Sequence, residues 1–302
     1  MATSEGTKEG YVGFEVPYLS RTCQTYYKII GTLHHGVPPL IAIAGGPSCG
    51  SEYFEILSDV TEGRPKTLVL YDQLGSGRST HLPETLGDTV LWTVQLFLDE
   101  LHNLHEKLGI DKYDLLGHSW GGTIATSYAV QRPPGLRNLI IFSSQPSTQL
   151  LMEGHAEIRS ILPREIREAL DKYEEDGRAT PEYRKGREYY TMHHMCMIVP
   201  MPPPIVMAFA WASKDPTVSL TMFGKGMFKV TGPMKDWSVV DQLSKIQVPT
   251  LVLNGAQDSA RNFSVAPFVD RIPNVKWVKF ENSSHMAHFE ERERFMQTNK
   301  YT

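Results

Sequence analysis

One short segment decides the fold: Tyr113-Asp114-Leu115-Leu116-Gly117-His118-Ser119-Trp120-Gly121-Gly122. Its first four residues form a short run typical of a buried strand, and its end begins a helix of small residues. Between them, Gly-x-Ser-x-Gly places Ser119 on the turn. Such a turn is strained, and Gly117 and Gly121 allow a close backbone approach that a Cβ atom would block. The segment predicts a nucleophile elbow, with an ordinary strand-to-helix turn as the alternative.

A serine hydroxyl needs a base, because it is a weak nucleophile until its proton is taken. In folds with this elbow the partners follow in the order Ser, acid, His, each after a later strand. Asp258 follows one apolar run through a short turn, and His285 follows the next run. We therefore expect a triad of Ser119, Asp258 and His285. The alternatives are His288 as the base and a turn-forming role for Asp258.

Short apolar runs bounded by turn residues recur in the first half of the chain, over residues 40–44, 67–71, 113–116 and 139–142, and predict buried strands. Two further strands are predicted over residues 250–254 and 276–280. Helical stretches lie between and after them, over residues 88–108, 122–131 and 290–297. The alternation predicts an α/β-hydrolase fold, in which a mostly parallel sheet is flanked by helices.

The alternation stops after Ser143 and resumes only near residue 250. The intervening segment holds charged helical stretches over 153–177 and 181–195 and a proline-rich stretch over 200–204. We expect residues 145–241 to form an inserted helical cap, and residues 1–144 and 242–302 to form the catalytic domain. A chain of 302 residues, 41% hydrophobic, is long enough to bury one large core with such an insertion.

Two backbone N–H groups should stabilise the oxyanion that forms during acyl transfer. One is expected from Trp120, directly after the nucleophile. The other is expected from Gly45 or Gly46, in the loop that follows the strand at 40–44. The alternative for this loop is a plain tight turn.

Composition excludes several functions. The formal net charge of -4, from 30 basic and 34 acidic residues spread along the chain, argues against nucleic acid as a partner. No apolar stretch reaches the roughly 18 residues of a membrane span, and no signal-peptide pattern opens the chain. The three scattered cysteines favour a reducing compartment. A cytoplasmic protein with a small-molecule substrate is the expectation, and its oligomeric state is left open.

A metal site is not expected. His193, His194 and Cys196 lie too close together on one predicted helix, and no fourth ligand accompanies them. They are interpreted as surface or cap-lining residues, and no cofactor is expected.

Several motifs resemble those of one family, the proline iminopeptidases with the related amino-acid amidases and tricorn-associated aminopeptidases. The motifs are Gly45-Gly46-Pro47, Tyr71-Asp72-Gln73-Leu74-Gly75-Ser76-Gly77-Arg78-Ser79, Gly117-His118-Ser119-Trp120-Gly121-Gly122, Thr231-Gly232-Pro233-Met234-Lys235-Asp236-Trp237, Val248-Pro249-Thr250-Leu251-Val252 and Ser284-His285-Met286-Ala287-His288. The resemblance spans nearly the whole chain. It implies a helical cap over the triad, no metal, and release of an N-terminal residue from small peptides or amides.

Three positions depart from that family. Ala44 replaces its histidine before Gly-Gly-Pro. Ser259 and Met227 stand where the family has acidic side chains that hold the α-amine of the substrate. An ammonium group in a dry pocket without a counter-charge is penalised by several kcal/mol, so amine recognition should be weak. Another carboxylate in the cap could compensate; the candidates are Glu153, Glu157 and Glu188.

The predicted cap is rich in Met and aromatic residues, which suit irregular apolar pockets. They are Met192, Met195, Met197, Met201, Met207, Phe209, Trp211, Met222, Met227 and Phe228. Packing within the cap is the alternative explanation. We predict that Met227, Ser259, Trp211 and Phe228 contact the substrate.

The leading hypothesis is hydrolysis of a small, neutral amide, ester or lactone through an acyl-enzyme on Ser119, in a biosynthetic or catabolic pathway. The first alternative is a prolyl aminopeptidase or amino-acid amidase with a relocated amine anchor. The second is a ligand-binding protein without hydrolytic activity on the same scaffold.

Overall fold

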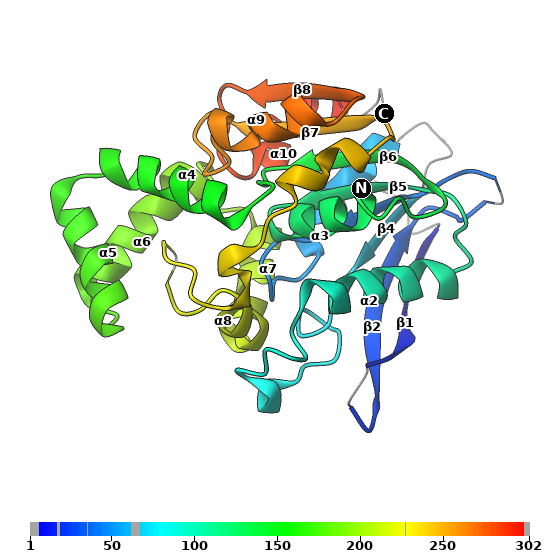
Figure 1. The fold of residues 1–302 in the computed structure, drawn as a ribbon, viewed down its shortest axis with the longest axis horizontal. Coiled ribbons are helices and arrows are strands. Elements are labelled where there is room, and N and C mark those ends of the chain that lie inside the picture. Colours follow the sequence, from blue (N-terminus) through cyan, green and yellow to red (C-terminus); the bar gives the residue numbers. More distant parts are fainter. Residues whose placement is uncertain (1–5, 17–18, 35, 62–66, 227, 299–302) are drawn as a thin grey trace.

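The computed structural model describes residues 6–16, 19–34, 36–61, 67–226 and 228–298. Within them, eight strands form one sheet in the order β1-β2-β4-β3-β5-β6-β7-β8 (Figure 1). The strands are β1 (Thr7–Glu15), β2 (Thr22–Ile30), β3 (Leu40–Ile43), β4 (Leu68–Tyr71), β5 (Tyr113–His118), β6 (Leu136–Phe142), β7 (Thr250–Gly255) and β8 (Val275–Phe280). From β4 to β8 neighbouring strands are parallel, whereas β2 is antiparallel to both β1 and β4. The predicted fold class is confirmed.

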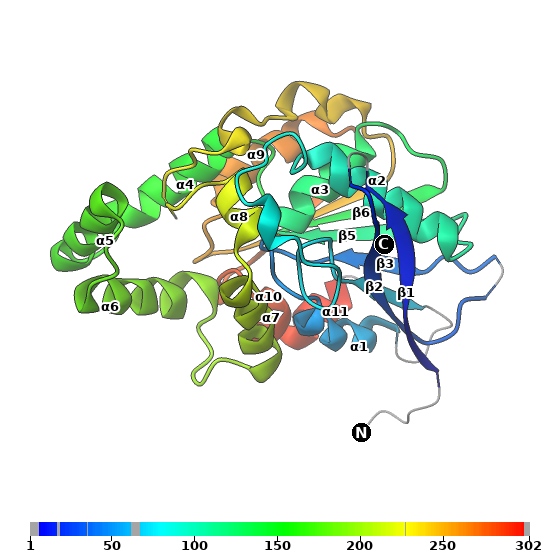
Figure 2. The same ribbon diagram turned by 90° about the horizontal axis from the view of Figure 1, so that it is seen from below.

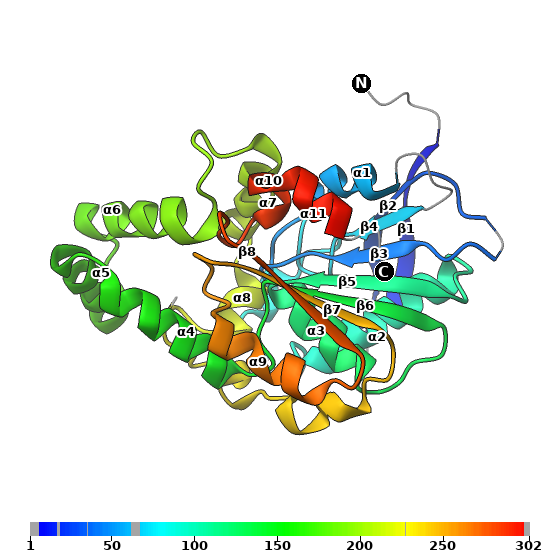
Figure 3. The same ribbon diagram turned by 90° about the horizontal axis from the view of Figure 1, so that it is seen from above.

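Helices cover both faces of the sheet. They are α1 (Ser58–Thr61), α2 (Val94–Lys107), α3 (Trp120–Ala129), α4 (Thr148–Ile161), α5 (Arg164–Asp176), α6 (Pro181–Tyr190), α7 (Pro203–Lys214), α8 (Thr217–Met222), α9 (Asn262–Arg271), α10 (Ala287–Glu290) and α11 (Arg292–Thr298). Shorter turns are the 3-10 helices η1 (Glu52–Leu57), η2 (Pro83–Thr85), η4 (Pro233–Asp236) and η5 (Val240–Lys245), and the π-helical turn η3 (Thr191–Met195). Figure 3 shows α2, α3 and α9 on one face and α1, α10 and α11 on the other. Two apolar cores result, one on each face.

Two helix boundaries and one hairpin differ from the sequence prediction for local reasons. Helix α2 begins only at Val94, because Thr93 caps it by accepting a hydrogen bond from the N–H of Leu96. The stretch 153–177 is two helices, α4 and α5, separated at Pro163, which favours a helix start over a helix interior. The hairpin β1–β2 was not predicted, since most of β1 is exposed and carries no buried apolar run.

The chain between β6 and β7 contains helices and turns but, among the described residues, no strand of the sheet. Helices α5 and α6 extend away from the sheet (Figures 1 and 2). The two ends of this segment meet: the N–H of Thr148 donates to the carbonyl of Trp237 at 3.0 Å, and that of Val239 donates to Pro146 at 2.9 Å. These contacts lie beside residues 145 and 241, and the domain boundaries placed there remain a prediction. No helix in the described ranges has the length and apolarity needed to cross a membrane.

Candidate active site

Ser119 occupies a strained turn between β5 and α3. Its backbone angles are φ 55° and ψ -120°, which a residue with a side chain rarely adopts. A Cβ on Gly117 would overlap the carbonyl of Gly121, and one on Gly121 would overlap the carbonyl of Ile43. The glycines thus let α3 pack directly against the strands. The geometry is that of the predicted elbow, with Ser119 facing a cavity.

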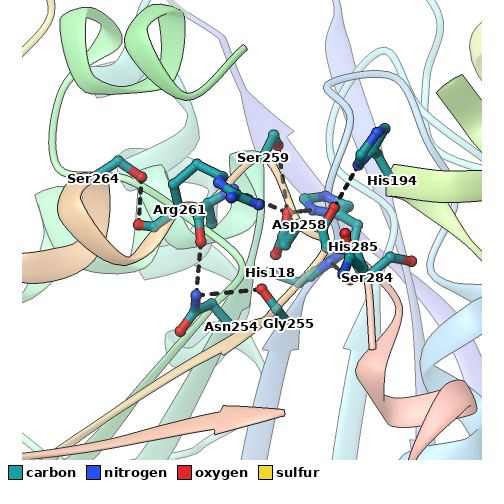
Figure 4. Close-up of polar contacts among 12 residues, drawn as sticks. His118, His194, Asn254, Gly255, Asp258, Ser259, Arg261, Ser264, Ser284 and His285 are labelled. Carbon is teal, nitrogen blue, oxygen red and sulfur yellow. Dashed lines mark hydrogen bonds and ion pairs between the residues drawn. The ribbon is translucent and has the colours of Figure 1, made fainter. Parts of the chain in front are cut away.

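Asp258 and His285 form a hydrogen-bonded pair after β7 and β8 (Figure 4). Oδ1 of Asp258 lies 2.8 Å from Nδ1 of His285 and accepts a further hydrogen bond from the N–H of Ala260 at 3.0 Å. Burial opposes ionisation of Asp258, but the charge and hydrogen bond of His285 hold the pKa of this carboxyl below its ordinary value. Because the carboxylate can only accept, Nδ1 of His285 carries a proton and Nε2 is left to accept one.

His288, the alternative base, lies in an aromatic cluster. Its fully buried ring is 5.6 Å from that of Tyr53, 5.8 Å from that of Phe54 and 5.3 Å from that of Phe142, measured between centroids. Burial and the nearby His285 lower the pKa of His288 to about 3, so its ring is neutral. The geometry therefore favours His285 over His288 as the partner of Asp258.

Two side chains hold the loop that contains Gly45 and Gly46. The hydroxyl of Tyr53 accepts a hydrogen bond from the N–H of Gly45 at 2.6 Å. Gln73 donates to the carbonyl of Ala44 at 3.0 Å and accepts from the indole N–H of Trp120 at 2.9 Å. Of the two glycines proposed for the oxyanion hole, Gly45 thus has its N–H engaged. Among the described residues, no hydrogen bond engages the N–H of Gly46.

A chain of hydrogen bonds continues from Tyr53 through His118 to the backbone of His285. Nδ1 of His118 lies 2.9 Å from the hydroxyl of Tyr53, and its Nε2 lies 3.0 Å from the carbonyl of His285. The carbonyl can only accept, so Nε2 of His118 donates and Nδ1 accepts from Tyr53. This assignment requires a neutral ring, and burial, followed by the neighbouring histidines, lowers the pKa of His118 well below its ordinary value.

The loops that carry Asp258 and His285 are also tied to the segment between β6 and β7. Arg261, just after Asp258, donates to Glu157 of α4 at 2.7 Å. Glu290 accepts from the N–H of Ser284 at 2.7 Å, from its hydroxyl at 2.6 Å and from the N–H of Met197 at 2.7 Å. Figure 4 shows how Asp258, Ser259 and Arg261 follow one another around this turn.

A cavity of about 400 Å³ lies over Ser119 and His285. Ser259 lines it, as do apolar side chains such as Leu151, Phe209 and Phe223. Its charged lining side chains, within the described ranges, are Arg187 and Lys225, and no Asp or Glu of those ranges lines it.

Two of the predicted substrate contacts lie elsewhere. Trp211 donates its indole N–H to Glu52 at 2.8 Å, and Phe228 packs in a separate cluster with residues of α4, α5 and α6. Neither is among the residues that line the cavity. Met227 lies outside the described residues.

The histidines of η3 have other partners. Nδ1 of His194 lies 2.7 Å from the carbonyl of Gln257, in the loop that carries Asp258, and Nδ1 of His193 lies 2.7 Å from that of Tyr189. In the described part of the chain, no three His, Cys, Asp or Glu side chains are grouped so that they could hold a metal ion.

Sequence reasoning missed Tyr53, Gln73 and Glu290. Gln73 lies in the Asp-Gln-Leu-Gly-Ser-Gly motif, which carried the resemblance but was given no role. Tyr53 and Glu290 carry no local signal, because their partners come from distant parts of the chain.

The fold and this geometry agree with the comparison with known families. Residues 38–292 match the family described as the alpha/beta hydrolase fold. The chain belongs to the α/β-hydrolase family. The proline iminopeptidase of Clostridium botulinum is 32% identical to this hydrolase over 292 residues, which cover 96% of this chain and 95% of that protein. That of Saccharolobus solfataricus is 34% identical over 264 residues, covering 86% and 83%.

Solved structures that are similar to the hydrolase include a proline iminopeptidase as well. The crystal structure of VinJ has a TM-score of 0.90 and 41% identity, covering 97% of this chain and 96% of that one. The structure of the proline iminopeptidase of Mycobacterium smegmatis has a TM-score of 0.87 and 34% identity, and covers 97% of each chain. The resemblance to the proline iminopeptidases that the motifs predicted is confirmed.

Proposed function

We propose that this hydrolase cleaves a small amide, ester or lactone through an acyl-enzyme on Ser119. The single observation that carries the proposal is the pairing of His285 with Asp258, at 2.8 Å, on the wall of the cavity that Ser119 also lines. A buried, ionised carboxylate that fixes the tautomer of a histidine beside a strained serine is the arrangement that activates a serine hydroxyl.

In the proposed reaction, Oγ of Ser119 attacks the carbonyl carbon of the substrate while Nε2 of His285 takes the hydroxyl proton. The N–H groups of Gly46 and Trp120 stabilise the negative oxygen that forms. His285 then returns the proton to the leaving group as the scissile bond breaks. A water molecule, activated by the same imidazole, hydrolyses the ester on Ser119 and restores the hydroxyl.

The substrate in this proposal has no free amine on its acyl part. An ammonium group under the cap would need a carboxylate to offset its loss of hydration. Of the compensating candidates, Glu157 is paired with Arg261, and neither Glu153 nor Glu188 lines the cavity. Arg187 and Lys225 add a further penalty for a cation.

A prolyl aminopeptidase is the second candidate, and the named activity of the relatives supports it. It requires an amine anchor that does not occur among the described cavity-lining residues. A ligand-binding protein without activity is the third candidate, and it gives no reason for the strain at Ser119.

The proposal retains a cytoplasmic location and a small-molecule partner. The location is supported by three buried cysteines that form no disulfide.

Proline p-nitroanilide and its N-acetyl form separate the first two candidates. We expect the N-acetyl form to have a kcat/KM higher by about tenfold or more, because capping removes the cost of burying the ammonium group. The Ser119→Ala variant provides the background rate for both substrates. A hundredfold preference for the free amine would make the hydrolase an aminopeptidase.

A further inference from the structure

We propose that the cavity selects substrates whose acyl part carries a carboxylate, held by Arg187 and Lys225. This inference rests on the proposed function and deepens it. The cavity then not only lacks a carboxylate for an ammonium group but also offers two cations to a negatively charged group.

The charged side chains that line the cavity, within the described ranges, are of one sign. Its ionisable lining residues, within the described ranges, are Cys49, Tyr53, His118, His155, Arg187, Lys225 and His285. Burial lowers the pKa of His155 to about 4 and that of His118 well below its ordinary value, so both rings are neutral. Burial raises the pKa of Cys49 to about 12 and that of Tyr53, so neither becomes an anion near pH 7. The lasting charges that face a ligand are those of Arg187 and Lys225.

Neither cation is neutralised by a neighbour. Within the described ranges, no ion pair joins Arg187 or Lys225 to an acidic side chain. Arg187 has one long hydrogen bond, 3.4 Å from Nη1 to the hydroxyl of Tyr183. Both side chains are exposed, so they can turn toward a ligand without breaking an existing ion pair. A guanidinium group presents paired donors to a carboxylate, and an ammonium group adds a point charge.

Each cation lies close to residues that pack around the cavity. Arg187 lies one helical turn before Tyr190, whose hydroxyl is 3.0 Å from His155 on the cavity wall. Lys225 follows Phe223, whose ring is 5.7 Å from that of Trp120, the residue next to the nucleophile. The two cations therefore approach the cavity from α6 and from the loop after α8. Ser147 lines the same cavity, and its hydroxyl, which accepts from the N–H of Leu150 at 3.2 Å, keeps its own proton to donate.

The size of the effect follows from Coulomb's law. Opposite unit charges about 6 Å apart, at an effective dielectric constant between 20 and 80, change a binding constant by roughly threefold to hundredfold. Exposed cations belong in the lower part of that range. We expect a preference of about tenfold for an anionic over a neutral substrate, and expect it to weaken as salt is added.

Three p-nitrophenyl esters of equal chain length test the proposal. Hexanoate is neutral, the monoester of adipic acid is anionic, and ω-aminohexanoate is cationic. The readout is the kcat/KM of each charged ester relative to that of hexanoate, after subtraction of the rate with Ser119→Ala. The expected order is adipate, hexanoate, aminohexanoate.

Two charge-removing variants show whether the named cations cause that order. Arg187→Gln combined with Lys225→Gln should bring the ratio of adipate to hexanoate close to one. Lys185→Gln combined with Lys229→Gln is the matched control, because it removes the same charge from exposed positions of the same two segments that do not line the cavity. The control should keep the wild-type ratio.

Each outcome supports or overturns a separate step. Equal rates for adipate and hexanoate in the wild type, or an unchanged preference in the Arg187 and Lys225 double variant, overturn the carboxylate site and leave the serine hydrolase intact. The same loss in both double variants shows a general surface-charge effect and also overturns the site. Failure to cleave any ester, together with no labelling of Ser119 by a fluorophosphonate, overturns the proposed function and this inference with it.

Discussion

At the scale of single residues, Tyr53 connects parts of the site that come from three loops. Its hydroxyl holds the N–H of Gly45, while His118 continues the chain to the backbone of His285. The loop, which has Ala44 at the position of the family histidine, is anchored here by Tyr53 and Gln73. Tyr53 is a positioning residue, because it acts on the reacting groups through the loops that carry them.

Replacing Tyr53 by Phe should lower kcat by about tenfold to a hundredfold and change KM much less. The Gly45 loop loses its anchor, and the oxyanion donor beside it becomes less well placed for the transition state. Tyr71→Phe is the matched control, since the hydroxyl of Tyr71 is buried without a hydrogen-bond partner in the described residues. Steady-state kinetics on one neutral ester measure both. Equal losses in kcat for the two variants would show that the Tyr53 hydroxyl does not position the site.

At the scale of secondary-structure elements, Glu290 joins the loop that carries His285 to the segment after η3. It is the last residue of α10, and its two oxygens receive three hydrogen bonds from Ser284 and Met197. The loop between β8 and α10, which carries His285, is therefore fixed against the segment proposed as the cap. Movement of that segment and placement of the base are linked.

The Glu290→Gln variant tests this link. One oxygen remains as an acceptor, so at least one of the three donors is left unpaired, at a cost of about 1–3 kcal/mol in the free energy of unfolding. We expect a lower urea midpoint and a reduced kcat. Glu293→Gln, at an exposed position of α11, is the control and should behave as the wild type. If the two variants have the same midpoint and rate, the contacts of Glu290 are not important for the loop that carries His285.

Sequence patterns predicted the central strands well and the polar connections poorly. A buried parallel strand such as β3 is apolar at every position, and that pattern is visible in the chain. The triad candidates could be named because each follows a predicted strand, although β8, which precedes His285, is buried only at Phe280. The hairpin β1–β2 has mostly exposed residues in β1, and the bond between Tyr53 and His118 joins residues that no periodicity relates.

At the scale of the whole molecule, the site lies between the carboxyl ends of the parallel strands and the helices that separate β6 from β7. Three histidines near the site are buried by this arrangement. His118, His155 and His288 are neutral because burial lowers the pKa of each, to about 4 for His155 and about 3 for His288. Glu100 is buried on the other face, and burial raises its pKa to about 7.

These shifts predict acid sensitivity. Each histidine has a pKa near 6.5 when unfolded, so between that pH and its folded pKa the unfolded state binds the extra proton. The stability present above pH 6.5 is therefore lost as the pH falls, by about 1.4 kcal/mol per pH unit for each histidine. Glu100 contributes the opposite slope, because its folded form binds a proton between pH 4.5 and about 7.

Urea unfolding between pH 7 and about pH 5 measures the net slope, and the His288→Phe variant isolates one part of it. Phe retains an aromatic ring among Tyr53, Phe54 and Phe142 and removes the titrating group. Below about pH 6.5 the slope should fall by up to about 1.4 kcal/mol per pH unit. Parallel curves for the variant and the wild type would mean that His288 is not buried in its neutral form.

Labelling by a fluorophosphonate, followed by mass analysis of the peptides, tests most directly whether Ser119 is an activated nucleophile. We predict one label, on the peptide that contains Ser119, with no labelling in Ser119→Ala and a rate at least about a hundredfold lower in His285→Ala. A label on another residue, or labelling of His285→Ala at the wild-type rate, would contradict the mechanism.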